Sequence, residues 1–388
     1  MSADQLRILI LHNTYLHKGG EDTVVANEVA CLKKNGFTVF YKEFSNESFQ
    51  QKGFASFLFP VSIIFNWYSF FEVLFFLRKH KITVLHAHNI FYKATPAIFW
   101  AAKWQGAKTI LTIHNYRLFC LNATFFRNNQ LCFDCLNQPH FKSGLKNKCF
   151  KKSYWASLSL ATSLRFNDWI HTWQKKVDHF IVVNEFSKQI LMQSGIQEGK
   201  IHFKHNFLMD MPEVSIAPKK DFYLFVGRLS EEKGIRHLLH AFEQLQHPLY
   251  IIGDGELRPM LQQTTHQPIK WLGLQSKTEV FALMQQCKAL IFPSIWIEGM
   301  PMTIIEAQCL GTIPIVANLV NTEKMIVDEV DGLLYEPANT AGLIDAIHRF
   351  ELLSPEKLQS MSHNARNKAL KLYTEAAHMQ LISEIYHG

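Results

Sequence analysis

Short, almost wholly apolar runs alternate along the chain with longer segments whose apolar residues recur at helical spacing. Runs such as RILILHN (7–13), ITVLHAH (82–88) and KTILTIH (108–114) contain too few polar positions for strands with one solvated face. They are typical of parallel strands that are buried on both faces. Each run ends in polar residues, and a turn then leads toward a helical segment. This order predicts parallel sheets with helices on both sides.

The alternating pattern occurs twice. The last strand expected in the first half covers 201–207, and the polar stretch 209–221 that follows contains two prolines, as linkers do. A new apolar run, FYLFV, begins at 222. A length of 388 residues also favours two domains. We therefore predict an α/β protein with two Rossmann-like lobes whose parallel sheets face each other across a cleft. The first lobe covers 1–208, and the second covers 222–370.

Residues 54–77 are very rich in phenylalanine. The length approaches that of a membrane span, but Pro60, Asn66 and Glu72 interrupt the apolar run, so we do not expect a transmembrane helix. Two interpretations stay open. The segment is either a helix packed on the sheet or a helix that also presents aromatic rings to a bilayer, where the basic residues in 78–81 would meet anionic headgroups.

The composition limits the classes of partner that the protein is expected to bind. The formal net charge of +7 and the pI near 8.9 favour an anionic partner. Nucleic acid is not expected, because the sequence contains no helix-turn-helix, zinc-finger or base-stacking pattern. The first residues, MSADQLRILILHN, have too short an apolar run for a secretory signal. Seven cysteines at uneven spacing do not resemble a secreted disulfide framework, so we expect a reducing, cytoplasmic environment.

Four of the cysteines lie in an apparent insertion at 118–152. They are Cys120, Cys132, Cys135 and Cys149. The C-x2-C pair with two flanking cysteines has the ligands of a four-thiolate structural zinc site, although the spacing matches no common zinc finger. The alternative is a set of free thiols.

Candidate ligand groups in the first half follow the predicted strands. His86, His88 and His114 come at strand ends, and the carboxyl edge of an open α/β sheet is where ligands bind. Such histidines are either structural or part of a site. Gly19 and Gly20 follow the first strand, where they would allow a phosphate to approach the backbone or would simply form a turn.

In the second half, Arg228 directly follows a buried strand and Lys233 closes the same turn, an arrangement suited to clamping a diphosphate. Further along, PSIWIEGMPMTIIEAQCLGTIPIVA (293–317) places Glu298 before a helix expected to begin near Met302, and Glu306 about one turn inside it. The carboxylates can accept hydrogen bonds from sugar hydroxyls. The backbone around the helix start can meet phosphate or sugar oxygens through the N–H groups of Gly299, Met300 and Met302, whereas Pro301 has none.

Seven short sequences in this order resemble the retaining glycosyltransferases of family 4, which have the GT-B fold. They are GGED (19–22), HAHN (86–89), TIHN (112–115), VNEFSK (183–188), GRLSEEKG (227–234), GDGE (253–256) and SIWIEGMPMTIIEA (294–307). The cysteine-containing insertion is similar to that of bacterial members that build surface polysaccharide. The resemblance covers almost the whole chain, and it implies that the final helix, 371–388, crosses back to the first lobe.

The resemblance also implies roles for the candidate residues. Arg228 and Lys233 would bind the donor diphosphate and stabilise the charge on the leaving group. Glu306 would hold the ribose hydroxyls, and Glu298 would hold the donor hexose together with the backbone of Gly299, Met300, Pro301 and Met302. His114 would lie beside the sugar ring, and Gly19 and Gly20 near the phosphate. His114, Glu298, Arg228 and Lys233 are thus the residues expected to act in catalysis.

The implied activity is transfer of a hexose from a nucleotide-diphosphate sugar to a glycan or lipid-linked acceptor, with retention of configuration. No cofactor is expected for catalysis, since no aspartate pair suggests obligatory magnesium. The implied location is the inner face of the cytoplasmic membrane, as a peripheral protein on an anionic surface. Two alternatives are a nucleotide-sugar epimerase on the same fold and a non-catalytic subunit of a polysaccharide assembly complex.

Overall fold

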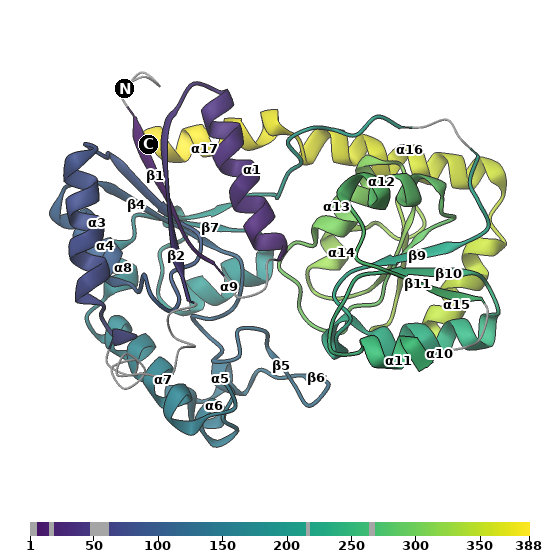
Figure 1. The fold of residues 1–388 in the computed structure, drawn as a ribbon, viewed down its shortest axis with the longest axis horizontal. Helices are drawn as coiled ribbons and strands as arrows, with labels where there is room; N and C mark the ends of the chain where they lie inside the picture. The colour runs from purple at the N-terminus through teal and green to yellow at the C-terminus, as the bar shows by residue number, and fades with distance from the viewer. Residues whose placement is uncertain (1–5, 15–18, 47–61, 215–217, 264–267) are drawn as a thin grey trace. The chain divides into compact units, whose positions relative to one another are not determined.

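The computed structural model describes residues 6–14, 19–46, 62–214, 218–263 and 268–388. The chain forms two compact units, shown in Figure 1. The first consists of Met1–Phe125, Cys132–Met209 and His378–Gly388, and the second of Phe126–Leu131 and Asp210–Ala377. Each unit contains a six-stranded parallel sheet. The predicted fold class, α/β with two Rossmann-like units, is confirmed.

The sheet of the first unit has the strand order β2-β1-β3-β4-β7-β8. Its strands are β1 (Arg7–Thr14), β2 (Thr38–Ser45), β3 (Val84–Ala87), β4 (Lys108–Ile113), β7 (His179–Val182) and β8 (Ile201–Phe203). Its helices are α1 (Gly20–Lys34), α3 (Trp67–Lys79), α4 (Ala97–Trp104), α5 (Asp134–Asn137), α6 (Lys142–Lys146), α7 (Tyr154–Trp169), α8 (Thr172–Lys176), α9 (Glu185–Gln193) and, from His378, α17 (Glu375–His387). The short hairpin β5 (Phe126–Arg127) and β6 (Gln130–Leu131) interrupts this unit in sequence.

Successive residues of β1 explain why this sheet needs helices on both faces. Leu9 and Leu11 pack in a core with α3 and α4, whereas Ile8 and Ile10 pack in a second core with α1 and α17. Because side chains of a strand alternate between the faces, an uninterrupted apolar strand must be covered on both sides. Figure 1 shows α3 and α4 on one side of this sheet and α1 and α17 on the other.

The sheet of the second unit has the order β11-β10-β9-β12-β13-β14. Its strands are β9 (Tyr223–Val226), β10 (Leu249–Ile252), β11 (Ile269–Gly273), β12 (Leu290–Phe292), β13 (Pro314–Ala317) and β14 (Leu333–Tyr335). Its helices are α10 (Ile235–Leu245), α11 (Arg258–Gln263), α12 (Lys277–Gln286), α13 (Met302–Cys309), α14 (Thr322–Met325), α15 (Thr340–Glu351) and α16 (Pro355–Leu372). Phe225 faces α10 and α15, and the preceding Leu224 faces α12 and α13.

The phenylalanine-rich segment is not one helix over 54–77. Residues 54–61 lie outside the described part of the chain, and α3 begins only at Trp67. Asn66 sets this start, because its side-chain oxygen accepts a hydrogen bond from the N–H of Ser69 at 3.2 Å and so caps the helix. Among the described residues, no helix is long and apolar enough to cross a membrane.

Candidate functional site

The donor-side candidates follow the two central strands of the second sheet. Strands β9 and β12 are neighbours in this sheet. After β9 the chain continues to β10 on one side, and after β12 it continues to β13 on the other side, so the strand order reverses between β9 and β12. Ligands bind at such a switch point, outside the carboxyl ends of the strands. Arg228 and Lys233 lie on the connection after β9, and the stretch that begins at Pro293 follows β12. The topology therefore gathers both predicted groups at one sheet edge.

The two connections touch through a glycine. Gly234 has a φ of +71°, and a Cβ built at this position would lie 1.9 Å from the carbonyl oxygen of Pro293. Only glycine combines this backbone conformation with so close an approach. Next to this contact, the N–H of Ile295 donates to the carbonyl of Glu232 at 2.9 Å. The turn that carries Lys233 is thereby fixed against the segment that carries Glu298.

Glu298 is the centre of the polar contacts here. Its side chain is nearly buried, and Oε1 accepts hydrogen bonds from Lys233 Nζ at 2.6 Å, Ser294 Oγ at 2.6 Å and Trp296 Nε1 at 2.7 Å. The ammonium of Lys233 also lies 5.5 Å from the centre of the Trp296 ring. Charge-assisted hydrogen bonds of this length are the stronger kind. The structure thus joins two predicted site residues directly, as an ion pair that the sequence did not indicate.

Arg228 is placed differently. Its side chain is 63% exposed, and its nearest carboxylate partner is Glu232, with 3.9 Å between Nη1 and Oε1. Exposed ion pairs of this kind contribute at most about 1 kcal/mol, so the guanidinium can exchange this partner for an anionic ligand at little cost.

Helix α13 begins at Met302, as predicted, with Pro301 as its N-cap residue. Because the first N–H groups of a helix have no partner within the helix, this end favours anionic or sugar oxygens. Glu306 lies four residues further along, and burial raises the pKa of its carboxyl to about 7, although Lys277 opposes this shift. Gly299 and Met300 lie between Glu298 and the helix start, and Met300 is buried.

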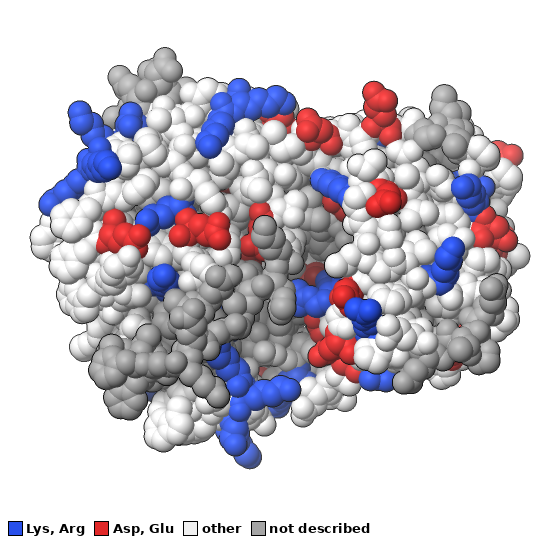
Figure 2. Space-filling model, in the orientation of Figure 1, with Lys and Arg blue, Asp and Glu red and all other residues white. Residues whose placement is uncertain are grey.

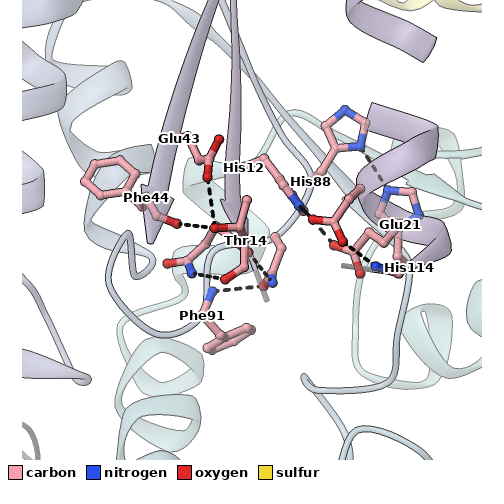
Figure 3. A network of polar contacts seen from close by, with 12 residues as sticks. His12, Thr14, Glu21, Glu43, Phe44, His88, Phe91 and His114 are labelled. Carbon is pink, nitrogen blue, oxygen red and sulfur yellow. Dashed lines mark hydrogen bonds and ion pairs between the residues drawn. The ribbon is translucent and has the colours of Figure 1, made fainter. Parts of the chain in front are cut away.

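In the first unit, the strand-end histidines belong to a buried polar network. Glu28 on α1 lies at its centre and forms a short ion pair with Lys204, which follows β8. The other carboxylate oxygen, Oε1, lies 3.1 Å from His86 Nδ1 and 3.6 Å from His88 Nε2. His88 Nδ1 in turn lies 2.9 Å from His114 Nε2 (Figure 3).

The charges in this network follow from its burial. Burial alone would raise the pKa of Glu28, but Lys204 and the two imidazoles outweigh burial and hold the pKa well below its usual range. Burial lowers the pKa of His88 to about 3, and it lowers the pKa of His114 well below the ordinary histidine value. The network therefore holds one ionised pair, Glu28 with Lys204, surrounded by neutral imidazoles.

The sequence contains a signal for the burial of Glu28. Val24, Val25, Cys31 and Leu32 mark the buried face of α1, and Glu28 lies at helical spacing in the middle of that face. A charged residue in such a position is rarely buried unless it is paired. Its partner Lys204 lies 176 residues away, so the pattern of α1 does not identify it.

The glycine pair lies at the start of α1. Gly19 is its N-cap residue and Gly20 its first residue. The N–H of Gly19 donates to Oδ2 of Asp22 at 2.7 Å, which closes the first turn. A Cβ built at either glycine would meet no atom within 4 Å. The backbone here is accessible to a ligand, and the phosphate-binding role stays a prediction.

The four cysteines of the insertion lie near one another. Burial and the neighbouring Cys120, Cys149 and Cys132 together raise the pKa of Cys135 to about 11, although a backbone hydrogen bond with Gly144 opposes this shift. However, the only group of three possible ligands with donor atoms within 4.8 Å of one another, among the described residues, is Glu28, His86 and His88. The sulfur atoms would have to move closer to surround zinc, so the structural zinc stays a prediction.

Comparison with known proteins gives one family. Residues 18–208 match the model of Glycosyltransferase Family 4, and residues 209–368 match that of Glycosyl transferases group 1. The Anabaena protein HepE, solved in complex with UDP, has a TM-score of 0.67 and 16% identity over 98% of this chain and 99% of its own. That likeness shows the fold.

Two Escherichia coli relatives match in sequence. One, UDP-Gal:alpha-D-GlcNAc-diphosphoundecaprenol alpha-1,3-galactosyltransferase, is 27% identical over 190 residues, which are 46% of this chain and 48% of the relative. The other, O-antigen chain mannosyltransferase C, is 28% identical over 167 residues, 41% of this chain and 44% of the relative. The chain thus spans about half the length of the curated relatives that it matches.

The two parallel-sheet units and the likeness to HepE show the GT-B fold. Within that class, the chain belongs to glycosyltransferase family 4, as its sequence indicated.

Proposed function

We propose that this protein transfers a hexose from a nucleotide-diphosphate sugar to a glycan or lipid-linked acceptor in surface polysaccharide synthesis, with retention of configuration. The observation that carries the proposal is the Lys233–Glu298 pair, fixed beside the start of α13 at the switch point of the second sheet. The names of the two Escherichia coli relatives, which specify a galactosyltransferase acting on a lipid diphosphate sugar and an O-antigen mannosyltransferase, support the acceptor class.

Each donor-side group has a role in this proposal. Arg228 and Lys233 bind the diphosphate and stabilise its negative charge as it leaves the sugar. Lys233 keeps further N–H donors for phosphate oxygens while it binds Glu298, because an ammonium has three. Glu298 and the backbone at Gly299 to Met302 hold the hexose, and Glu306 accepts hydrogen bonds from the ribose. The leaving phosphate helps to deprotonate the acceptor on the same face of the sugar.

A donor panel tests this function. The protein is incubated with UDP-, GDP-, ADP- and dTDP-linked sugars, and thermal stabilisation and slow donor hydrolysis are measured. We expect one class of donor to stabilise and to be hydrolysed with retention at the anomeric carbon. If no donor stabilises the protein, the proposal is wrong. Conversion of a donor to its epimer in the absence of an acceptor would show that the protein is an epimerase and not a transferase.

The variant Arg228→Ala tests the diphosphate contact. Because the side chain is exposed, we expect folding to be unchanged and UDP affinity to fall roughly tenfold, the loss of one charge-assisted contact. Arg236→Ala is the matched control, since Arg236 is also exposed in the same unit and binds Glu231. Equal UDP affinity of the two variants in calorimetry would refute the role of Arg228.

We also propose that the first unit binds an anionic membrane surface through α3, at the cytoplasmic face. Trp67, Phe75 and the nearby Trp104 are 63%, 62% and 71% exposed, which is unusual for rings of this size. Figure 2 shows a mostly uncharged surface over α3, with Lys and Arg side chains gathered at its upper end. Aromatic rings beside basic residues suit the interface of an anionic bilayer.

Vesicle sedimentation tests this surface. We expect the protein to sediment with phosphatidylglycerol vesicles more than with phosphatidylcholine vesicles, and the double variant Trp67→Ser/Phe75→Ser to lose most of this binding. Trp155→Ser is the control, because Trp155 is equally exposed but lies on α7. Equal sedimentation with and without anionic vesicles would remove the proposal.

A further inference from the structure

His114 contacts a second histidine, and that histidine faces a buried carboxylate. His88 Nδ1 lies 2.9 Å from His114 Nε2, with the two rings inclined by 16°, and His88 Nε2 lies 3.6 Å from Glu28 Oε1. Glu28 and His88 are buried, whereas His114 keeps part of its surface exposed. The three side chains form a line from the interior of the first unit to the carboxyl edge of its sheet.

The buried end of this line decides which ring nitrogens carry protons. A neutral imidazole has one N–H and one bare nitrogen. An N–H directed at a carboxylate is attracted to it, and a lone pair in the same place is repelled, strongly so where no water screens the charge. His88 therefore carries its proton on Nε2, toward Glu28, and its Nδ1 is bare.

A bare Nδ1 on His88 determines the state of His114. Two nitrogens 2.9 Å apart need one proton between them, so His114 Nε2 must donate to His88. Because His114 is also neutral, its remaining nitrogen, Nδ1, has no proton. His114 then offers a hydrogen-bond acceptor, which suits a sugar hydroxyl that donates.

We propose that Glu28 and His88 are positioning residues that fix His114 as the Nε2–H tautomer, so that its Nδ1 accepts a hydrogen bond from a hydroxyl of the sugar. The sugar contact rests on the proposed function, but the tautomer does not. The proposal adds a role for Glu28 on α1, which is not among the candidate site residues that the sequence indicated.

The surroundings of Glu28 keep its charge in place. Lys204 binds its other oxygen, Oε2, and His378 on α17 approaches the same oxygen to 4.0 Å. His86 is held by Tyr386 and Thr112, with Nδ1 2.7 Å from the phenol oxygen and Nε2 2.7 Å from the threonine hydroxyl. One ammonium therefore neutralises the carboxylate, and the neutral groups around it supply dipoles. This arrangement leaves no net negative charge to attract a divalent cation.

A metal ion on Glu28, His86 and His88 would give the opposite tautomer of His114. Metal binding needs a bare Nε2 on His88, which moves the proton to Nδ1. His88 would then donate to His114 Nε2, and His114 would carry its proton on Nδ1. The tautomer of His114 thus separates the two interpretations of the same three side chains.

Nitrogen NMR of the wild-type protein, labelled in its histidine rings, measures the tautomer of His114 directly. We expect His114, assigned by its loss in His114→Gln, to show a protonated Nε2 and a bare Nδ1 between pH 6.5 and 8. A proton on Nδ1 overturns the proposal, and metal analysis of the same sample then shows whether an ion is the cause. The measurement needs no donor, so a protein without transferase activity can still confirm the tautomer.

Glu28→Gln gives a directional test. The amide oxygen of a glutamine accepts from Lys204, which leaves its NH2 group to donate to His88 Nε2. We expect His114 to move its proton to Nδ1. Should this variant fail to fold, His88→Phe removes the middle member of the Glu28–His88–His114 line. We then expect His114 to become a mixture of its two tautomers. An unchanged His114 in a folded variant refutes the roles of Glu28 and His88.

Two further measurements separate positioning from plain stability. His202→Phe is the control, because His202 forms a similar histidine pair in the same unit, with 3.0 Å between its Nε2 and His179 Nδ1. It should leave the His114 tautomer unchanged. With the donor found in the panel, Glu28→Gln should lower kcat/KM roughly five- to tenfold, the value of one hydrogen bond. A donor lacking the hydroxyl that His114 accepts should show no such difference, and an equal loss with this donor would refute the sugar contact.

Discussion

Glu306 gives the sharpest test of the donor side, because its carboxyl is partly buried and is essential to the proposed ribose contact. The pKa of this group is raised from an ordinary 4.5 to about 7. A glutamate with a raised pKa stabilises the fold in its protonated form. That contribution is complete below pH 4.5 and is lost as the pH rises through 7.

The size of the effect follows from the shift. A difference of about 2.5 pKa units, at about 1.4 kcal/mol for each unit, makes the ionised form about 3 kcal/mol less favourable in the folded protein. Glu306→Gln replaces the carboxyl by a neutral group of the same shape. The free energy of unfolding of the variant should therefore exceed that of wild type by about 1 kcal/mol at pH 5 and by about 3 kcal/mol at pH 8.

Urea unfolding of both proteins at pH 5 to 8 measures this difference. Glu279→Gln is the control, since Glu279 caps α12 in the same unit and the side-chain hydrogen bond of Ser276 holds its pKa below the ordinary value. Its difference from wild type should stay constant in this range, because a glutamate with a lowered pKa is ionised throughout. Parallel curves for wild type and Glu306→Gln would refute the reasoning about burial.

Three further predictions concern other parts of the molecule. UDP binding at pH 7 should release protons, because hydrogen bonds from the ribose hydroxyls favour the ionised form of Glu306. Calorimetry in buffers of different ionisation enthalpy measures the number of protons released, and a value of zero would contradict the ribose contact. Gly234→Ala should lower the free energy of unfolding by more than about 2 kcal/mol through its clash with Pro293, whereas Gly19→Ala, whose Cβ meets nothing, should leave the unfolding midpoint within a few degrees. Protein purified without chelators should contain one zinc per chain, and Cys132→Ser/Cys135→Ser should contain none; wild-type protein without metal would establish free thiols.

Much of the fold was predictable because buried parallel strands have a distinctive pattern. The predicted strand runs at 82–88 and 108–114 contain β3 and β4, and α13 starts at the predicted Met302, since Pro301 directly precedes it as the N-cap residue. The start of α3 was not predicted, because the apolar run continues upstream of the capping Asn66. The composition of that segment shows its high aromatic content, but it does not show that Asn66 caps the helix.

The sequence singles out residues for the candidate site, but it does not predict the contacts between them. Arg228, Lys233 and Glu298 each carry a local signal, such as a position after a buried strand. The ion pair between Lys233 and Glu298 joins residues 65 apart, and it depends on how the connections after β9 and β12 meet at the sheet edge. The local sequence pattern does not indicate which connections contact each other, so the Lys233–Glu298 pair is seen only in the three-dimensional structure.

The position of α17 has a consequence for how the chain is made. Ile382 and Ile385 fill the core beneath β1, and Tyr386 reaches His86 inside the first unit. During synthesis, the first 209 residues therefore leave the ribosome with this face of their sheet covered by α1 but not by α17, and Asp210–Ala377 of the second unit follow before α17 is available. The unit that begins the chain is the last to be completed, and removal of even the final turns would leave an apolar surface and a buried ion pair open to water.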